Sequence, residues 1–252
     1  MILEMFIGLM IFAFLCELID STLGMGYGTT LTPILLLFGF PPLLIVPSVL
    51  FTEFITGILS GLLHHKAKNV HFGKKSLDTK VMAILSICSV IGTIIAVYIA
   101  NYIPTFYLKL YIGILVLSMG IAVFITRNKT FKFSWKKIIG LGTVASFNKG
   151  MSGGGYGPLV TSGQILSGVK DKSAIGITSI SEGITSGVGF TMFILIGTNI
   201  DFSFILPLFI GAILSVPLSV LFVKKISSFI LKRSISLLTV VLGLVTIIKL
   251  VI

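Results

Sequence analysis

The chain is a succession of long apolar stretches interrupted by short polar or glycine-rich segments. Because each crossing of a bilayer takes about 20 apolar residues, stretches of this length indicate membrane-spanning helices. The expected fold is therefore all-α and polytopic. The ten hydrophobic segments that we predict cover residues 2–19, 24–40, 43–63, 81–100, 108–126, 138–147, 153–168, 173–197, 204–223 and 234–252.

Three of these segments are short. Two of them open on glycine-rich stretches, and the third, 138–147, ends at Asn148 and Lys149. Non-helical backbone is tolerated at membrane depth only where protein or a water-filled cavity covers it. We therefore expect broken or short helices at the centre of the molecule, and whether they cross fully or re-enter is open.

The composition excludes a water-soluble enzyme. Of the 252 residues 55% are hydrophobic and only 11% are charged, against about 25% in an ordinary soluble domain. These charges cannot form a polar shell, and the spans leave no room for a separate catalytic domain. Cys16 and Cys88 both lie inside apolar runs, so we predict neither a disulfide nor a metal site from them. No cofactor site is predicted.

The net charge of +11 reflects membrane topology. The chain has nineteen Lys and Arg residues and only eight Asp and Glu residues. In a soluble protein this excess of basic residues would indicate nucleic-acid binding. Here the basic residues form short blocks between apolar runs, as in the cytoplasmic loops of membrane proteins. The predicted partners are thus the lipid bilayer and a small substrate, with no nucleic acid.

The two halves of the chain repeat one another. Sliding the chain by 129 positions without a gap aligns ten identical residues in a window of 33. Gly- and Ile-rich membrane sequences match easily, but a glutamate, a tyrosine and three spaced glycines at one offset favour an internal duplication. The pairs are Gly24 with Gly153, Gly26 with Gly155, Tyr27 with Tyr156, Gly28 with Gly157, Thr32 with Thr161, Leu37 with Leu166, Gly39 with Gly168, Glu53 with Glu182, Ile55 with Ile184 and Thr56 with Thr185.

Loop charges predict that the repeats have opposite orientations. The loop 64–80 carries five lysines, whereas its counterpart 198–203 has no basic residue. Other pairs of loops alternate in the same way, and five segments per copy would invert the second copy. We expect a single membrane domain over 1–252, with a first repeat at 1–126, a cytoplasmic linker at 127–137 and a second repeat at 138–252. The N-terminus is predicted outside, before a retained first span, and the basic loops face the cytoplasm.

The glycine-rich stretches are candidates for an anion site. Glycine lets backbone approach a ligand closely, and the start of a helix exposes free N–H groups at the positive end of its dipole. The alternative is close packing of helices through small residues. The predicted substrate-binding residues are Gly24, Gly26, Tyr27, Gly28, Thr32, Asn148, Ser152, Gly153, Gly155, Tyr156, Gly157 and Thr161.

Two intramembrane carboxyls are candidates for proton coupling. Glu53 and Glu182 lie mid-run at equivalent positions of the repeats, and an ionised carboxyl facing lipid is costly, so both should face the interior. They are interpreted either as proton carriers or as hydrogen-bonded braces of a broken helix. Lys149 either attracts an anion into a vestibule or extends to the membrane interface.

The glycine-rich stretches also resemble a known family. Residues 24–33, GMGYGTTLTP, look like the first signature of the sulfite exporter TauE/SafE family, and residues 150–158, GMSGGGYGP, look like its second. The second copy has Ser162 where the first has Pro33, so the two halves need not bind alike. The resemblance implies a transporter of the bacterial inner membrane for small sulfur-containing anions such as sulfite, thiosulfate or organosulfonates.

The sequence therefore predicts a secondary transporter rather than an enzyme. In this interpretation the anion binds at the glycine-rich helix starts and coupling to protons involves the two glutamates. An anion channel of the same architecture is the alternative. The identity of the anion, the direction of transport, the coupling ion and self-association into a homo-oligomer are open at this point.

Overall fold

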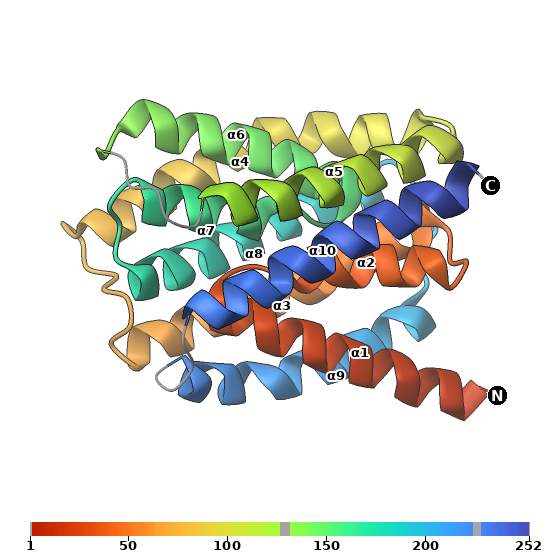
Figure 1. The fold of residues 1–252 in the computed structure, drawn as a ribbon, viewed down its shortest axis with the longest axis horizontal. Helices are drawn as coiled ribbons and strands as arrows, with labels where there is room; N and C mark the ends of the chain where they lie inside the picture. Colours follow the sequence, from red (N-terminus) through yellow and green to blue (C-terminus); the bar gives the residue numbers. More distant parts are fainter. Residues whose placement is uncertain (1, 127–131, 224–227, 252) are drawn as a thin grey trace.

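A computed structural model describes residues 2–126, 132–223 and 228–251, and in these ranges the secondary structure is helical throughout. Figure 1 shows the helices roughly aligned along the long axis of the molecule. They are α1 (Ile2–Leu23), α2 (Tyr27–Leu37), α3 (Pro42–Lys66), α4 (Leu77–Tyr102), α5 (Thr105–Thr126), α6 (Trp135–Ser152), α7 (Tyr156–Leu166), α8 (Asp171–Leu195), α9 (Phe202–Phe222) and α10 (Ser228–Val251).

Within the described ranges, five helices are long and apolar enough to cross a bilayer: α1, α3, α4, α5 and α9. Large apolar side chains such as Leu3, Ile87, Ile91 and Leu195 lie exposed on the outside. Apolar surface of this kind is unfavourable in water and favourable against lipid tails. The protein is therefore a multi-pass membrane protein.

Local signals begin and end the helices. α3 starts at a proline, Pro42, where the missing N–H would have had no helical partner. The Ser76 hydroxyl caps α4 by accepting from the Thr79 N–H at 3.1 Å, and Asp201 caps α9 by accepting from Ser203 and Phe204. At Gly153 the backbone turns left-handed, with φ of 70°, and α6 ends.

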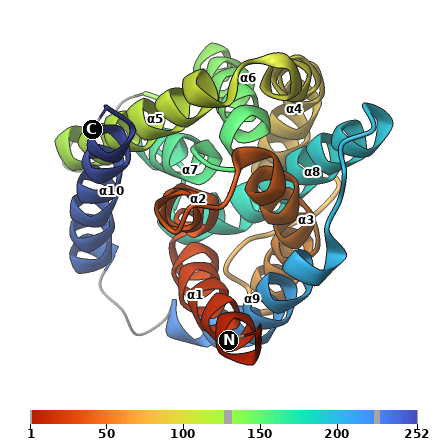
Figure 2. The same cartoon turned by 90° about the vertical axis from the view of Figure 1, so that its right-hand side faces the viewer.

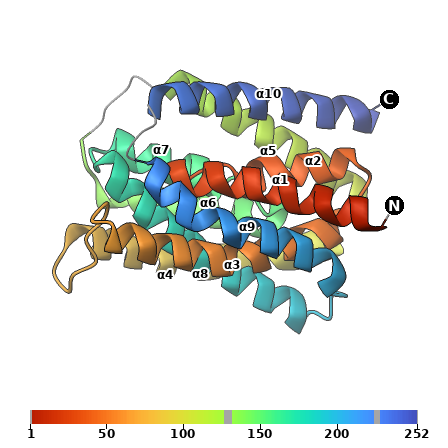
Figure 3. The same ribbon diagram turned by 90° about the horizontal axis from the view of Figure 1, so that it is seen from below.

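The short helices lie in the interior. α2 and α7 have 11 residues each, and in Figure 1 they run from the centre of the molecule towards opposite ends. Viewed along the molecule in Figure 2, both are surrounded by longer helices. α10 lies beside α5 at the edge of the bundle, as Figure 3 shows. The two short segments that open on glycines are thus buried half-length helices.

The helix contacts fall into matching pairs. α3 and α8, with 25 residues each, pack against each other, while α4 packs on α6 and α9 packs on α1. In Figure 1 the loop after α3 and the loop after α7 lie at one end of the molecule, and the α2–α3, α4–α5 and α8–α9 loops lie at the other. Residues 68–71 and 168–173 line one pocket of about 580 Å³, so the first two loops are close neighbours.

Several boundaries differ from the predicted segments. α6 runs from Trp135 to Ser152 and is not a short run ending before Asn148. α1 likewise continues past Asp20 to Leu23. Hydropathy ends a segment at the first charge, but a helix continues as long as its backbone bonds are satisfied and its polar groups find partners. α10 begins at Ser228, six residues before the predicted segment, and residues 127–131 of the predicted linker lie outside the described ranges.

Candidate functional site

The two glycine-rich turns meet at the centre of the molecule. A Cβ atom placed on Gly28 would lie 1.7 Å from the carbonyl oxygen of Gly153, and one placed on Gly157 would lie 2.6 Å from the carbonyl oxygen of Gly24. The beginnings of α2 and α7 are therefore in direct backbone contact, and only glycine fits at these positions. This contact supports the packing role of the glycines in the conformation seen.

Hydrogen bonds join the two turns across the contact. The Gly155 N–H donates to the Thr29 hydroxyl at 3.1 Å, and the Thr161 hydroxyl donates to the Gly24 carbonyl at 2.6 Å. Each bond links residues that are more than 120 positions apart in the chain. The turns thus form one unit that is built equally from both halves of the sequence.

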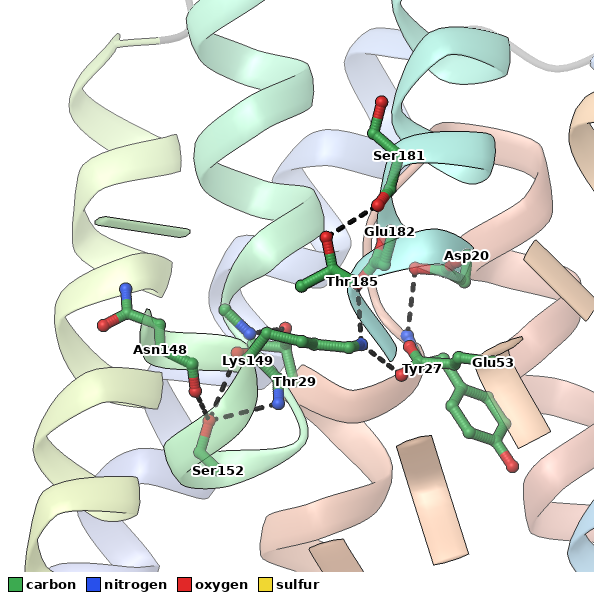
Figure 4. Close-up of polar contacts among 12 residues, drawn as sticks. Asp20, Tyr27, Thr29, Glu53, Asn148, Lys149, Ser152, Ser181, Glu182 and Thr185 are labelled. Carbon is green, nitrogen blue, oxygen red and sulfur yellow. Dashed lines mark hydrogen bonds and ion pairs between the residues drawn. The ribbon is translucent and has the colours of Figure 1, made fainter. Parts of the chain in front are cut away.

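A charged cluster lies beside this unit, as Figure 4 shows. The Lys149 ammonium donates to Glu182 Oε1 at 2.8 Å and also to Glu53 Oε2. The Lys149 side chain is 0% exposed, and the Glu53 and Glu182 side chains are 3% and 6% exposed. Buried charges are tolerated only when they are paired in this way. Helices α3, α6 and α8 each contribute one member of the cluster.

Asp20 completes the cluster from α1. Its carboxylate accepts the backbone N–H of Tyr27 at 3.2 Å, at the first residue of α2. Oxygens of Asp20, Glu53 and Glu182 all lie within 4.8 Å of one another. Such a trio has the geometry to hold a cation, and the Lys149 ammonium supplies a positive charge in the same place. The expectation that the protein holds no metal stays a prediction.

The sequence pattern alone does not pair Asp20 with Lys149. Asp20 directly follows the first apolar segment, and the predicted place of Lys149 is a vestibule or the membrane interface. A position at the interface is wrong, because Lys149 is fully buried. The offset of 129 that pairs Glu53 with Glu182 also carries Asp20 onto Lys149. A search for identical residues at this offset misses the pair, because an aspartate and a lysine are not identical. Opposite charges at equivalent positions are the signal in the sequence that points to the pair.

The other predicted ligands occupy the same central region. Asn148 accepts from the Tyr111 hydroxyl at 2.7 Å, and the Ser152 hydroxyl donates to the Asn148 carbonyl at 2.8 Å. Tyr27, Tyr156, Thr32 and Thr161 are buried. Gly24, Gly26, Gly153 and Gly155 lie in the turns, and Gly28 and Gly157 lie in the first turns of α2 and α7. All the predicted residues are thus close to the centre, although several already bond within the protein.

Residues 150–154 also read as G-x-S-x-G, a pattern shared with hydrolases that use a nucleophilic serine. Such a serine needs a base within hydrogen-bond reach. The Ser152 hydroxyl donates to the carbonyls of Asn148 and Gly154 and accepts the Gly154 N–H. Its partners are therefore backbone groups, and its role here is to hold the turn between α6 and α7.

Comparison with known proteins identifies the family. The model of the family described as "Sulfite exporter TauE/SafE" matches residues 9–246. The chain belongs to the sulfite exporter TauE/SafE family. A relative, the "Probable membrane transporter protein YtnM" of Bacillus subtilis (strain 168), is 31% identical over 234 residues, which cover 86% of this chain and 75% of the relative. No solved structure matches this TauE/SafE chain.

The family and the fold agree on the kind of protein. This TauE/SafE protein is a membrane transporter, and its family and its relative both point to transport rather than to catalysis. Buried polar contacts among the described residues lie where α1, α2, α3, α6, α7 and α8 come together. A transporter needs its polar groups at this depth, because the substrate has to leave water while it crosses.

Proposed function

We propose that this protein is a proton-coupled secondary transporter that moves small sulfur-containing anions across the bacterial inner membrane. Sulfite, thiosulfate and organosulfonates are the proposed substrate class. The observation that carries the proposal is the contact between the starts of α2 and α7 beside the buried ion pairs of Glu53, Lys149 and Glu182. The site combines the starts of two helices, where the helix dipole favours an anion, with carboxyls that can carry protons.

The proposed architecture is a pair of inverted repeats within one membrane domain, 1–126 and 138–252 joined by 127–137. The matched helix lengths and the equivalent packing of α4 on α6 and α9 on α1 support it. So do the opposite directions of α2 and α7 in Figure 1. Two inverted copies can exchange conformations, which opens a central site first to one side and then to the other. The N-terminus is proposed to lie outside and the basic loops in the cytoplasm.

Substrate access requires the glycine turns to move. In the conformation seen they touch through backbone atoms, so an anion has to enter as they separate or bind beside them. The hydroxyls of Thr32 and Thr161, at equivalent positions of the repeats, are fully or almost fully buried next to the turns. Thr32 Oγ1 has no hydrogen-bond partner among the described residues, which leaves it free to donate to a substrate oxygen.

Flux measurements on reconstituted protein test this function. In liposomes we expect saturable uptake of thiosulfate that a pH gradient accelerates. Glu53→Gln and Glu182→Gln should abolish this acceleration while the protein still folds, because an amide cannot carry the proton. Glu4→Gln, at an exposed residue in the first turn of α1, is the matched control. Unchanged proton-driven uptake in both buried variants would reject the coupling role and leave the glutamates as structural braces.

The alternative function is an anion channel with the same architecture. Inverted repeats also occur in channels, so the repeat does not distinguish the two functions. A channel would give large ohmic currents in planar bilayers and flux that does not saturate. The close contact of the two turns favours the transporter, because it blocks a continuous path through the centre in the conformation seen.

A further inference from the structure

The C-terminal ends of α1 and α6, which are at equivalent positions of the two proposed repeats, carry opposite charges. Asp20 lies in the last turn of α1 and Lys149 in the last turn of α6, and the repeat offset aligns them. The Asp20 carboxylate accepts the first N–H of α2. The start of α2 therefore already holds an anionic group of the chain itself, in the position that an external anion would take.

The start of α7 is different, because the residue equivalent to Asp20 is a cation. Lys149 leads directly into the turn 153–155, and its carbonyl accepts the Gly153 N–H at 2.8 Å. Its ammonium is turned to Glu53 and Glu182. The start of α7 thus has a buried cation where the start of α2 has a carboxylate, and the two carboxylates that bond this cation belong to α3 and α8.

The carboxyls around Lys149 outnumber it. Asp20, Glu53 and Glu182 surround one ammonium, and Glu53 Oε1 is buried with no hydrogen-bond partner in the described ranges. In a medium of low dielectric constant an excess of negative charge is costly, and protons relieve it most simply. The orphaned oxygen of Glu53 is where a proton can bind without breaking a bond to Lys149.

We infer that Lys149 is the binding residue for the transported anion and that Glu53 and Glu182 pair with its ammonium when the anion is absent. An arriving anion displaces the glutamate carboxylates, and for each negative charge that it brings one displaced carboxylate takes up a proton from water. Binding one negative charge with uptake of one proton leaves the net charge of the buried cluster unchanged. This inference rests on the proposed function, since it explains why anion and proton move together.

Other titratable groups near Lys149 also contribute to the net charge of the buried cluster. They come from α1, α2, α3, α7 and α8, and those that interact electrostatically with the cluster are Cys16, Glu17, Asp20, Tyr27, Glu53, Tyr156 and Glu182. Glu17 accepts the Ser21 hydroxyl at 2.6 Å and Asp20 accepts the Tyr27 N–H. Both are thereby held by α1 and α2 and do not bond Lys149, which makes Glu53 and Glu182 the groups that exchange with the anion.

The test measures anion binding to the full-length protein in detergent. The probes are thiosulfate, methanesulfonate and nitrate as potassium salts at equal ionic strength, and the readout is the melting temperature with titrated affinity. In alkaline buffer the variant Glu53→Gln with Glu182→Gln should bind anion about 10- to 100-fold more tightly than the wild type, because a charge-assisted hydrogen bond no longer has a competitor. The pH dependence of binding should largely disappear.

Adding Lys149→Met to this double variant should remove the binding. The triple variant has no unpaired charge at these three positions, so it should still fold. Lys136→Met in the same double background is the control, because Lys136 is an exposed lysine on the same helix. The inference is overturned if the triple variant keeps its anion-dependent shift in melting temperature, or if no probe stabilises the double variant.

The outcomes separate this inference from the proposed function. If nitrate stabilises the double variant through Lys149 but the sulfur anions do not, the exchange at Lys149 holds and the substrate class fails. If the sulfur anions bind the wild type and the triple variant alike, the transporter proposal holds and the role of Lys149 fails. Uptake of one proton per bound negative charge, measured in weakly buffered solution, should accompany binding to the wild type only.

Discussion

At the scale of single residues, Lys149 holds the buried charged cluster at the centre of the molecule together. It bonds two glutamates that approach from different helices, α3 and α8, while it is itself carried by α6. Removing one member of a buried ion pair leaves the partner charge uncompensated, which costs about 3–5 kcal/mol, whereas replacing all members by neutral groups is often tolerated. The cluster therefore binds three helices together as well as holding charge.

Lys149→Met alone should lower the free energy of unfolding by about 3–5 kcal/mol, since two buried carboxylates lose their counter-charge. The same change together with Glu53→Gln and Glu182→Gln should recover most of that loss. Thermal unfolding in detergent measures both. Equal stability of the single variant and the wild type would contradict the buried ion pairs.

Gly28 should tolerate no side chain. Gly28→Ala places a methyl group on the carbonyl of Gly153, so we expect a larger loss than the about 1–3 kcal/mol typical of overpacking. Gly8→Ala is the control, because a Cβ there has no atom within 4 Å. Yield and melting temperature of the purified variants are the measurements, and a Gly28→Ala protein as stable as the control would show that the turns do not touch.

At the scale of helices, close packing of small residues brings the two glutamates together. A Cβ on Gly57 of α3 would lie 2.7 Å from the Ser179 carbonyl, and one on Gly183 of α8 would lie 2.9 Å from the Ile58 nitrogen. Small residues let helix backbones approach closely in membranes. Since Glu53 and Glu182 lie within one turn of these glycines, the crossing of α3 and α8 sets the distance across which Lys149 bonds both.

The cap of α9 gives a pH-dependent contribution to stability. Hydrogen bonds from the Ser203 hydroxyl and from the N–H groups of Phe204 and Ser203 lower the pKa of Asp201 below its ordinary value. A lowered carboxyl pKa adds stability at neutral pH that is lost as the pH falls through the lowered pKa. Asp201→Ala should cost about 1 kcal/mol at neutral pH.

Asp201→Asn is the matched control for this cap, because an amide oxygen accepts the same N–H groups without titrating. Its melting temperature at neutral pH should stay near that of the wild type. In acid the difference between wild type and Asp201→Ala should shrink, while the difference between Asp201→Asn and Asp201→Ala should remain. A constant difference between wild type and Asp201→Ala at all pH values would contradict the charged cap.

At the scale of the whole molecule, the proposed topology places chemically different loops on opposite sides of the membrane. The loops after α3 and α7 gather at one end, as Figure 1 shows. Lys74 lies in the first of these loops, and Lys172 lies in the first turn of α8, directly after the second. The opposite end contains Tyr107 and Asn199 in or next to the α4–α5 and α8–α9 connections. Positive loops are retained in the cytoplasm, which orients both repeats at once.

Single cysteines test this orientation in a background without Cys16 and Cys88. Tyr107→Cys and Asn199→Cys should react in intact cells with a maleimide that cannot cross membranes. Lys74→Cys and Lys172→Cys should react only after the cells are opened. All four positions are exposed on the protein surface, so a difference reflects the side of the membrane. Labelling of both loop sets in intact cells would reject the orientation.

Many of the helices and central residues of this protein can be predicted from its sequence, because a segment that crosses lipid must be a long run of apolar residues. Apolar length predicts helices, and the offset of 129 aligned Gly28 with Gly157 and Glu53 with Glu182, residues that the structure then places in the centre. Helix ends were less accessible, because Asp20 and Lys149 ended the apolar runs while the helices continued. A charge signals the end of a helix only when it has no partner at membrane depth.

The amino-acid sequence alone establishes a helical membrane protein with two glycine-rich stretches, and it aligns Glu53 with Glu182 at one offset, because apolar length and residue identity are read along the chain without knowledge of the fold. The contact between the two turns, the hydrogen bond from the first N–H of α2 to Asp20 and the bonds from Lys149 to both glutamates are visible only in the folded structure. These contacts join residues from different helices and different halves of the chain. Which charges pair depends on how the helices cross, and that crossing follows from packing over the whole molecule.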